Sequence, residues 1–255
     1  MKQLITLLTV ILALSSCKKE TIVQPPAPVT PKKVAQVKSQ EYPASDISYT
    51  YDNLGRMSTE ETASDKYTFV YTPGKCAYED YNKTQNRIYI KADYDLNSSG
   101  FVIHSMQTVF PTPNSTVTSE HFYTYDADNH LVNWKYTNSN GPDQYEIKYT
   151  FSAGNLTTMV SMKNGIVMAT HHYTYGNIAD LLSVNITSNI SGVKNLFGQG
   201  NKQLPAGFEY IDKNNMKAAE GVYNFELDAQ GYPVKLTYHD ITSNTDTHTS
   251  YFYDK

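Results

Sequence analysis

The polar segment around residue 126 carries side chains that could bind a metal ion. Asp126, Asp128 and Asn129 place oxygen atoms at the close spacing of a calcium-binding loop. Calcium takes about six to eight oxygen ligands, and the EF-hand loop adds a glycine and a distant glutamate, which the residues after His130 do not supply. The equivalent position in other copies of a repeated segment is a turn without these acids. Turn formation is therefore the default interpretation, and a calcium site at Asp126 and Asp128 is the alternative.

A pair of adjacent histidines is a second place where a metal site could begin. His171 and His172 could be joined by His104, His121 or His130 to hold a zinc ion. Neighbouring residues of a strand point to opposite faces, so His171 and His172 cannot both ligate one ion without a bulge. We therefore expect no metal site and no cofactor.

Paired carboxylates are the third chemical possibility, because glycosidases use two acids about 5 to 10 Å apart. Glu60 with Glu61, and Glu79 with Asp80, are neighbours in sequence, but adjacent acids diverge on a strand. No nucleophile elbow is present for a serine or cysteine hydrolase. We therefore expect no catalytic residues. The alternative is a hydrolase of envelope or dietary polymers with acids drawn from Glu120, Asp126, Asp128 and Glu146.

The single tryptophan is the strongest candidate for ligand binding. Trp134 alternates with Val132 and Tyr136 along one predicted strand, which favours core packing. If that face is open, Trp134, Tyr123, Tyr125 and Tyr136 would form an aromatic platform on which sugar rings can stack. Both interpretations stay open at this stage.

The elements that position these side chains are predicted to be strands. From Ser45 onward a unit recurs, in which a tyrosine-alternating strand leads into a polar turn and a second strand. Clear copies occupy residues 49–57 and 123–131. In residues 147–151 the odd positions are apolar and the even positions are polar. This alternation predicts strands with one buried and one wet face.

The spacing of the turns indicates a stack of hairpins. The residues before the turns are 51, 94, 125, 151, 175, 227 and 253, and the last four steps are 24 to 26 residues or twice that. Residues 197–207 break the pattern and are expected to form an inserted loop, while the best helical candidate, residues 214–220, is short. We predict an all-β fold, a repetitive antiparallel β-hairpin meander that forms a large curled sheet or an open or closed barrel.

The first 17 residues have the pattern of an export signal. Met1-Lys2-Gln3 is followed by an apolar run to Leu14, which is shorter than the roughly 20 residues that a membrane-spanning helix needs. The motif that follows, Leu14-Ser15-Ser16-Cys17, resembles the bacterial lipobox. The resemblance implies a lipoprotein signal peptide over residues 1–16 and lipid attachment at Cys17. Cys76 is then left alone, so no disulfide framework is expected.

Residues 17–44 are predicted to be a lipidated cysteine followed by a tether rich in proline and lysine. Five of the eleven prolines lie here, and proline removes the amide donor that a sheet needs. We therefore expect this segment to stay extended and outside the sheet, with one all-β domain over residues 45–255. The net charge of −4 gives no electrostatic case for binding nucleic acid.

Two family resemblances follow from the repeated segment. The stretch Tyr-x-Tyr-Asp-x-x-Gly-Arg-Met at residues 49–57 resembles a YD repeat of the RHS type. Over residues 45–255 the pattern is similar to DUF4595, a domain of unknown function in exported lipoproteins of Bacteroides-like bacteria. The second resemblance implies a porin-like sheet or barrel and brings no catalytic residues with it.

These observations favour a membrane-anchored envelope lipoprotein that presents a tyrosine-rich sheet without catalysis. Its expected partners are the membrane, through the lipid on Cys17, and a glycan, a peptide or another envelope protein. The expected location is the outer membrane, with the periplasmic or surface face left open. An outer-membrane pore is a further alternative, although tyrosine and polar residues stand where lipid-facing aliphatic residues should lie.

Overall fold

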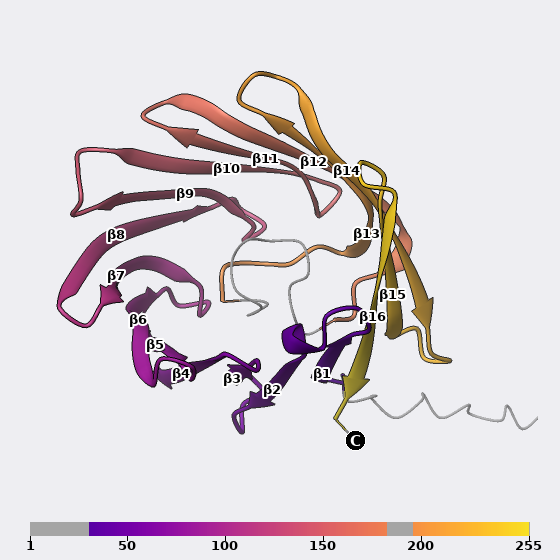
Figure 1. The fold of residues 1–255 in the computed structure, drawn as a ribbon, viewed down its shortest axis with the longest axis horizontal. Coiled ribbons are helices and arrows are strands. Elements are labelled where there is room, and N and C mark those ends of the chain that lie inside the picture. Colours follow the sequence, from indigo (N-terminus) through magenta and orange to yellow (C-terminus); the bar gives the residue numbers. More distant parts are fainter. Residues whose placement is uncertain (1–30, 183–195, 255) are drawn as a thin grey trace, which may run out of the picture. The chain divides into compact units, whose positions relative to one another are not determined.

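The computed structural model of the protein describes residues 31–182 and 196–254, so the predicted signal peptide and Cys17 lie outside the described residues. In these ranges sixteen strands follow one another in sequence order, and each pairs antiparallel with its neighbours (Figure 1). The strands are β1 (Val34–Ser39), β2 (Ile47–Tyr51), β3 (Met57–Glu61), β4 (Asp65–Thr72), β5 (Lys75–Asn82), β6 (Arg87–Leu96), β7 (Val102–Thr112), β8 (Ser115–Tyr125), β9 (Leu131–Asn138), β10 (Gln144–Ser152), β11 (Asn155–Lys163), β12 (Ile166–Ala179), β13 (Gln203–Asp212), β14 (Lys217–Leu227), β15 (Pro233–Asp240) and β16 (Thr245–Tyr253).

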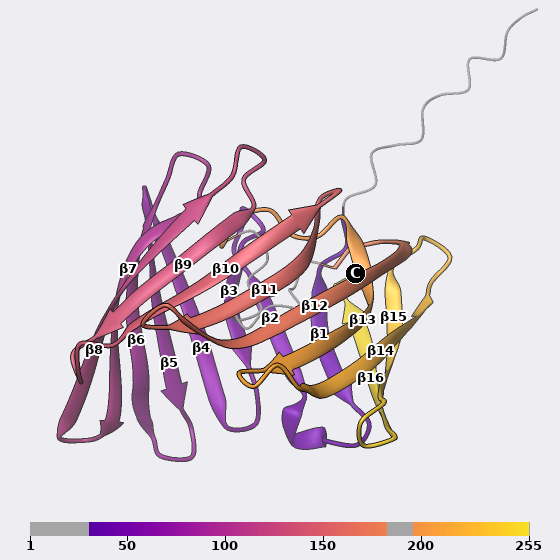
Figure 2. The same ribbon diagram turned by 90° about the horizontal axis from the view of Figure 1, so that it is seen from above.

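The sheet closes on itself because β1 pairs with both β2 and β16. Val37 of β1 stands opposite Tyr251 of β16, and the ring of sixteen strands has no free edge. The strands run at a slant across the wall, as closure of a sheet into a barrel requires (Figure 2). The predicted all-β hairpin meander is therefore confirmed, and of the predicted alternatives the closed barrel is the one formed.

The inner face of the barrel carries the tyrosines and the outer face carries the charges. Buried tyrosines recur on successive strands because every second residue faces inward. They are Tyr49, Tyr78, Tyr94, Tyr123, Tyr149, Tyr173 and Tyr251. Lysine and glutamate pairs lie between them on the outside, such as Lys91 with Glu79 at 3.5 Å and Lys235 with Glu226 at 3.0 Å.

The predicted tether is wrong for residues 34–39, which form β1. The prolines of this segment stop at Pro31 and resume at Pro43, so the stretch between them keeps its amide donors. Val34 and Val37 both face inward because the register of β1 shifts between Val34 and Gln36, and Val34 is fully buried. Lys32 and the residues after it belong to the same compact unit as the barrel, so this unit begins before the predicted boundary at residue 45.

The predicted inserted loop is placed correctly only in part. The connection between β12 and β13 spans residues 180–202, and residues 203–207 of the predicted loop belong to β13. Two described residues of this connection form hydrogen bonds with turns of the barrel. The amide of Gln199 donates to the carbonyl of Asn129, and the amide of Lys202 donates to the carbonyl of Gly154. The predicted turn at residues 176–177 is also wrong, because β12 continues to Ala179.

A short 3-10 turn at Pro43–Ser45 is the helical element of the described ranges. The helical candidate at residues 214–220 is wrong, since Asn215 sits in a tight turn and Lys217 already begins β14. Further along the same strand, Tyr223 and Phe225 both face the inside of the barrel. This alternation is typical of a strand and does not fit a helix. Between residues 31 and 182 and between 196 and 254, no helix is long and apolar enough to cross a membrane.

The repeated turn has one hydrogen-bonding scheme. In the turn at Asp52, the Oδ1 atom accepts the amides of Leu54 and Arg56, and Gly55 adopts a φ of +79°. A side chain that caps its own turn in this way, with glycine or asparagine at the positive φ, explains the Asp-x-x-Gly spacing of the repeat. The same scheme is built on Asn97, Asp126, Asp212 and Asp228.

The tyrosine before the turn also has a repeated role. The hydroxyl of Tyr51 donates to the carbonyl of Val34 at 2.7 Å, and that of Tyr125 donates to the carbonyl of Val102 at 2.5 Å. The hydroxyl of Tyr253 likewise donates to the carbonyl of Pro233. In each case the acceptor is the first residue of the preceding strand of the wall, so the Tyr-Asp pair both ends one strand and holds the start of its neighbour.

Candidate functional site

Five ring side chains line the inner side of β8, β9 and β10, and we refer to them as the aromatic wall. They are His121, Tyr123, Trp134, Tyr136 and Tyr145. The ladder register places Tyr123 opposite Trp134, and His121 opposite Tyr136, which in turn faces Tyr145. Neighbouring rings are nearly parallel, with centroids 5.9 Å apart for Tyr123 and Trp134 and 4.7 Å apart for Tyr136 and Tyr145.

A chain of hydrogen bonds holds the tryptophan in this wall. Trp134 Nε1 donates to His121 Nδ1 at 3.0 Å, and His121 Nε2 lies 2.7 Å from Ser119 Oγ. Because indole nitrogen can only donate, His121 Nδ1 must be the acceptor, which leaves the proton on Nε2. Burial agrees with a neutral ring, since it lowers the pKa of His121 to about 4, with a smaller contribution from the charge of His104.

The residues of the aromatic wall differ in how deeply they are buried. Tyr123 and His121 are buried, whereas Trp134, Tyr136 and Tyr145 are only half-buried. Phe197, from the connection between β12 and β13, packs on Tyr123 with the ring centroids 5.4 Å apart. One end of the wall is thus covered by the chain itself, and the other end presents ring faces that a ligand could contact.

The structure brings together three of the four residues named for the predicted platform. Tyr123, Trp134 and Tyr136 lie together in the wall. Tyr125 lies beyond it, tilted against Phe101 and bonded to the carbonyl of Val102, so its role is the strand contact described above.

His121 and Tyr145 belong to the wall and were missed by the sequence prediction. His121 precedes Tyr123 by two residues on the same strand, and this spacing was the available signal.

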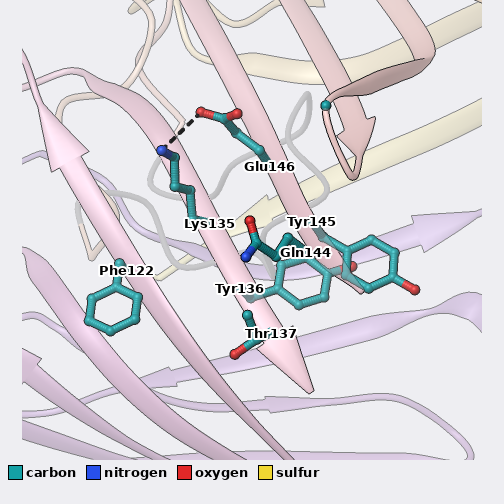
Figure 3. A pocket seen from close by; sticks show the side chains of 8 residues that line it. Phe122, Lys135, Tyr136, Thr137, Gln144, Tyr145 and Glu146 are labelled. Atoms are coloured by element: carbon teal, nitrogen blue, oxygen red, sulfur yellow. Dashed lines mark ion pairs between the residues drawn. The ribbon is translucent and has the colours of Figure 1, made fainter. Parts of the chain in front are cut away.

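A pocket of about 220 Å³ lies at the same strands (Figure 3). Its lining comprises Phe122, Lys135, Tyr136, Thr137, Gln144, Tyr145, Glu146 and Gly165. Phe122 and Lys135 alternate with the residues of the aromatic wall and therefore face outward, where Phe122 is 49% exposed. Lys135 and Glu146 form an ion pair across it, with a 3.5 Å separation (Figure 3). The pocket therefore has an exposed apolar ring and a charged pair in its lining, together with Tyr136 and Tyr145 of the aromatic wall.

The calcium candidates take part in turn formation. Asp126 Oδ1 accepts the amides of Asp128 and His130 at 3.0 and 2.8 Å, and Oδ2 lies 3.1 Å from His130 Nδ1. These hydrogen bonds help to hold the pKa of Asp126 below its usual value, although burial opposes them. The Asp126 carboxylate is engaged by the chain itself. In the described ranges, no three side chains of histidine, cysteine, aspartate and glutamate are grouped as a metal would require.

The two adjacent histidines point in opposite directions, as predicted. His171 faces inward, with its ring centroid 4.8 Å from that of Tyr210. His172 occupies the alternate position opposite Glu209. The two rings therefore do not meet at one site.

The four acids proposed for a hydrolase do not converge. Glu120 contacts His104 on the outside at 3.0 Å, and Glu146 accepts a hydrogen bond from Asn133 at 2.6 Å. This bond and the nearby lysines lower the pKa of Glu146, as expected for an acid held in its charged form. Asp126 and Asp128 stay in their turn, and of the four acids only Glu146 lines the pocket described above.

A different pair of acids faces the inside, and their spacing along the chain does not indicate that they lie on one row. Glu60 and Asp80 are buried, with relative exposures of 8% and 6%. Across β2 to β5, Glu60 stands opposite Tyr49 on one side and Tyr67 on the other, and Tyr67 stands opposite Asp80. The two acids therefore lie in one row with Tyr67 between them. Burial raises the pKa of Glu60 to about 7 and, with the charge of Asp65, that of Asp80 to about 6.

Cys76 behaves as a packing residue. It is 1% exposed in the inner core, and burial raises the pKa of its thiol to about 12. A thiol held in this protonated state is a poor nucleophile.

Comparison with known proteins supports the architecture and leaves the family open. No protein-family model matches the chain, and no curated protein matches it either. Two crystal structures share its fold. A porin-like protein from Bacteroides vulgatus ATCC 8482 aligns with a TM-score of 0.63 and 16% identity, over 88% of this chain and 99% of the other. A porin-like protein from Bacteroides uniformis ATCC 8492 aligns with a TM-score of 0.60 and 15% identity, over 89% and 99% of the two chains. At these identities the likeness concerns the fold, and the chain is similar to porin-like barrels of Bacteroides.

Proposed function

We propose that this protein is a lipid-anchored envelope lipoprotein that binds a glycan, without catalysis, on the aromatic wall inside its barrel. The observation that carries the proposal is the contiguous, half-buried set of Trp134, Tyr136 and Tyr145, in which Tyr136 stacks on Tyr145 and is tilted by 34° against Trp134. Pyranose rings have apolar faces that stack on aromatic side chains, while their hydroxyl groups need polar partners at the edges. The rings of the wall lie on neighbouring strands, so successive sugar units of a glycan could each contact one ring.

The absence of convergent acids at the wall supports binding without chemistry. Among the described residues, the wall contains no carboxylate, and its one titratable ring near neutrality, His121, is held neutral by Trp134 and Ser119. The four acids considered for a hydrolase lie on the outside or in a turn. A ligand held on the wall would therefore be retained rather than cleaved.

Lipid anchoring at Cys17 rests on the sequence motif at residues 14–17. The chain from Lys18 to Pro31 separates that cysteine from the unit that contains the barrel, and fourteen residues in an extended polyproline conformation would reach about 43 Å. A spacer of this kind supports display of the barrel in the aqueous part of the envelope, on either the periplasmic or the surface face of the outer membrane.

The outer face of the barrel favours this placement over a membrane-embedded pore. A transmembrane barrel keeps an apolar band toward the lipid and its polar side chains toward the lumen. Here the arrangement is the reverse, with buried tyrosines inside and ion pairs outside, such as Lys217 with Glu209 at 2.6 Å and Lys135 with Glu146 at 3.5 Å. We therefore propose a porin-like shape that stands in water.

A glycan array followed by titration tests the binding proposal. Trp134 is the only tryptophan of the chain, so its emission reports directly on the wall. A glycan selected on the array should change that emission on binding, and Tyr136→Ala and Tyr145→Ala should each weaken binding about tenfold, as expected for a lost stacking contact of about 1.4 kcal/mol. Phe252→Ala, at an exposed ring of β16 on the outer face of the barrel, is the matched control and should leave binding unchanged.

Two results would overturn the binding proposal. One is an array without any bound glycan. The other is a glycan that binds the double variant of Tyr136 and Tyr145 as tightly as the unmodified protein. The anchor is tested separately by Cys17→Ser, which should release the protein from the membrane fraction, whereas Cys76→Ser should not change its location.

A further inference from the structure

The acidic pair Glu60 and Asp80 has no partner in the barrel. Glu60 Oε2 and Asp80 Oδ1 are fully buried and make no hydrogen bond. No ion pair among the described residues includes either acid. A buried carboxylate normally has a cation or several donors beside it, because an isolated charge is costly in an apolar environment.

The nearby cations are engaged elsewhere. Arg56 pairs with Asp52 at 2.7 Å and lies over the ring of Tyr71. Lys83 pairs with Glu61 at 2.9 Å, on the opposite side of the strand from Glu60. Within the part of the chain that the structure describes, the two buried acids on the inner wall are thus left without a positive group paired to either of them.

Aromatic rings surround the two acids. Tyr67 stands between Glu60 and Asp80 in the register, and its ring stacks on that of Tyr78 with centroids 6.2 Å apart. Tyr49 stands next to Glu60 on the other side. Since neighbouring strands are about 4.8 Å apart, the backbones of Glu60 and Asp80 are about 10 Å apart, with ring faces between them.

We propose that Glu60 and Asp80, with the rings of Tyr49, Tyr67 and Tyr78, form a binding site for an organic ammonium ion. The two carboxylates supply negative charge, and tyrosine rings attract cations through their electron-rich faces. An alkylated or primary ammonium carries apolar groups that suit ring contacts. This site lies on β3 to β5 and is separate from the aromatic wall on β8 to β10, so it does not depend on glycan binding.

A metal ion fits this arrangement less well. Calcium and magnesium need about six or more oxygen ligands, whereas two acids separated by a tyrosine ring offer few. Among the described residues, no set of three potential metal-binding side chains is close enough together to hold an ion. The raised pKa values of Glu60 and Asp80 are consistent with buried carboxyl groups that have no cation beside them.

Choline and its neutral isostere 3,3-dimethylbutan-1-ol provide a matched test, because they differ chiefly in the positive charge. Isothermal titration at constant ionic strength should show binding of choline and none of the alcohol. Glu60→Gln and Asp80→Asn should each weaken choline binding at least tenfold. Glu79→Gln is the matched control, since Glu79 neighbours Asp80 but faces outward toward Lys91, and it should leave binding unchanged.

Unfolding curves without ligand show whether the variants are folded. At pH 8, above the pKa of both acids, Glu60→Gln and Asp80→Asn should each unfold at a higher temperature than the unmodified protein, because each removes an unpaired buried charge. The proposal is overturned if choline and butylammonium fail to bind at millimolar concentration, if the alcohol binds as well as choline, or if calcium chloride binds at Glu60 and Asp80 instead.

Discussion

Trp134 Nε1 donates a hydrogen bond to His121 Nδ1 at 3.0 Å, and this contact decides the protonation state of the ring on which the indole stacks. The imidazole is left with one proton, on the nitrogen beside Ser119. A second proton on His121 would remove the acceptor and place a charge in a buried position. The aromatic wall is therefore built for a neutral histidine.

The emission of Trp134 should report this state directly. With the pKa of His121 lowered to about 4 by burial, the emission should stay constant between about pH 8 and pH 5 and change with a midpoint near pH 4. The unfolded protein binds this proton at about pH 6.5, so the stability contributed by neutral His121 is complete above that pH and is lost as the pH falls toward 4. Circular dichroism measured in parallel separates ring protonation from acid unfolding, and a midpoint near pH 6.5 in the folded protein would contradict the assignment.

Asp126 should contribute more to stability than its neighbour Asp128. Asp126→Ala leaves the amides of Asp128 and His130 without their acceptor, and we expect a loss of about 1 to 3 kcal/mol in the free energy of unfolding. Asp128→Ala should cost less than about 0.5 kcal/mol, because the Asp128 side chain is exposed. Urea denaturation measures both values. Equal losses, or a marked stabilisation of the unmodified protein by calcium, would favour a metal site instead.

The tyrosine hydroxyls that hold neighbouring strands should have similar effects in different parts of the barrel. Tyr51→Phe and Tyr125→Phe each remove one hydrogen bond to a backbone carbonyl, and each should cost about 1 kcal/mol. The two losses should add in the double variant, since the sites lie on separate strands. Tyr89→Phe, at a residue that is 39% exposed, is the control, and a loss there of the same size would show that the hydroxyl contacts are not the cause.

Glu60 should make the barrel less stable as the pH rises. Its pKa is raised from 4.5 to about 7, so the folded state retains a proton that the unfolded state has released. This contribution is complete below about pH 4.5 and is lost as the pH rises through 7, with a total of up to about 3 kcal/mol.

Comparison of variants isolates the effect of Glu60 from that of other titrating groups, such as Asp80 and His104. The difference in unfolding free energy between pH 5 and pH 8 should shrink in Glu60→Gln and persist in Glu79→Gln. An unchanged difference in Glu60→Gln would mean that Glu60 is already charged at neutral pH in the folded protein.

The hairpin architecture could be predicted because its signals are local. Alternation along a strand and the turn after residue 51 or 125 involve residues within ten positions of each other. The pairing of β1 with β16 could not be predicted in the same way. Val34 and Tyr253 are 219 positions apart, and the short strand Val34–Ser39 sits next to prolines without an aromatic residue.

The candidate sites show the same division between local and distant information. Trp134 and Tyr136 share a strand, and Tyr123 lies on the preceding one, so their proximity follows from hairpin pairing. Tyr145 joins them only through the exact register of the next hairpin. Glu60 and Asp80 lie two strands apart, where an error of one residue in register would send either acid to the outside.

Closure between β1 and β16 also constrains how the protein reaches its native state. Each hairpin can form from neighbouring residues, but the last seam joins the beginning of the barrel to its end. Such long-range pairing slows folding, because the entropy of a large loop is lost before the contact forms. Until Thr245–Tyr253 has emerged, β1 and β15 each expose an unpaired edge that can recruit other chains. The interval before seam formation is therefore when this protein is most open to aggregation, and when a chaperone would help it most.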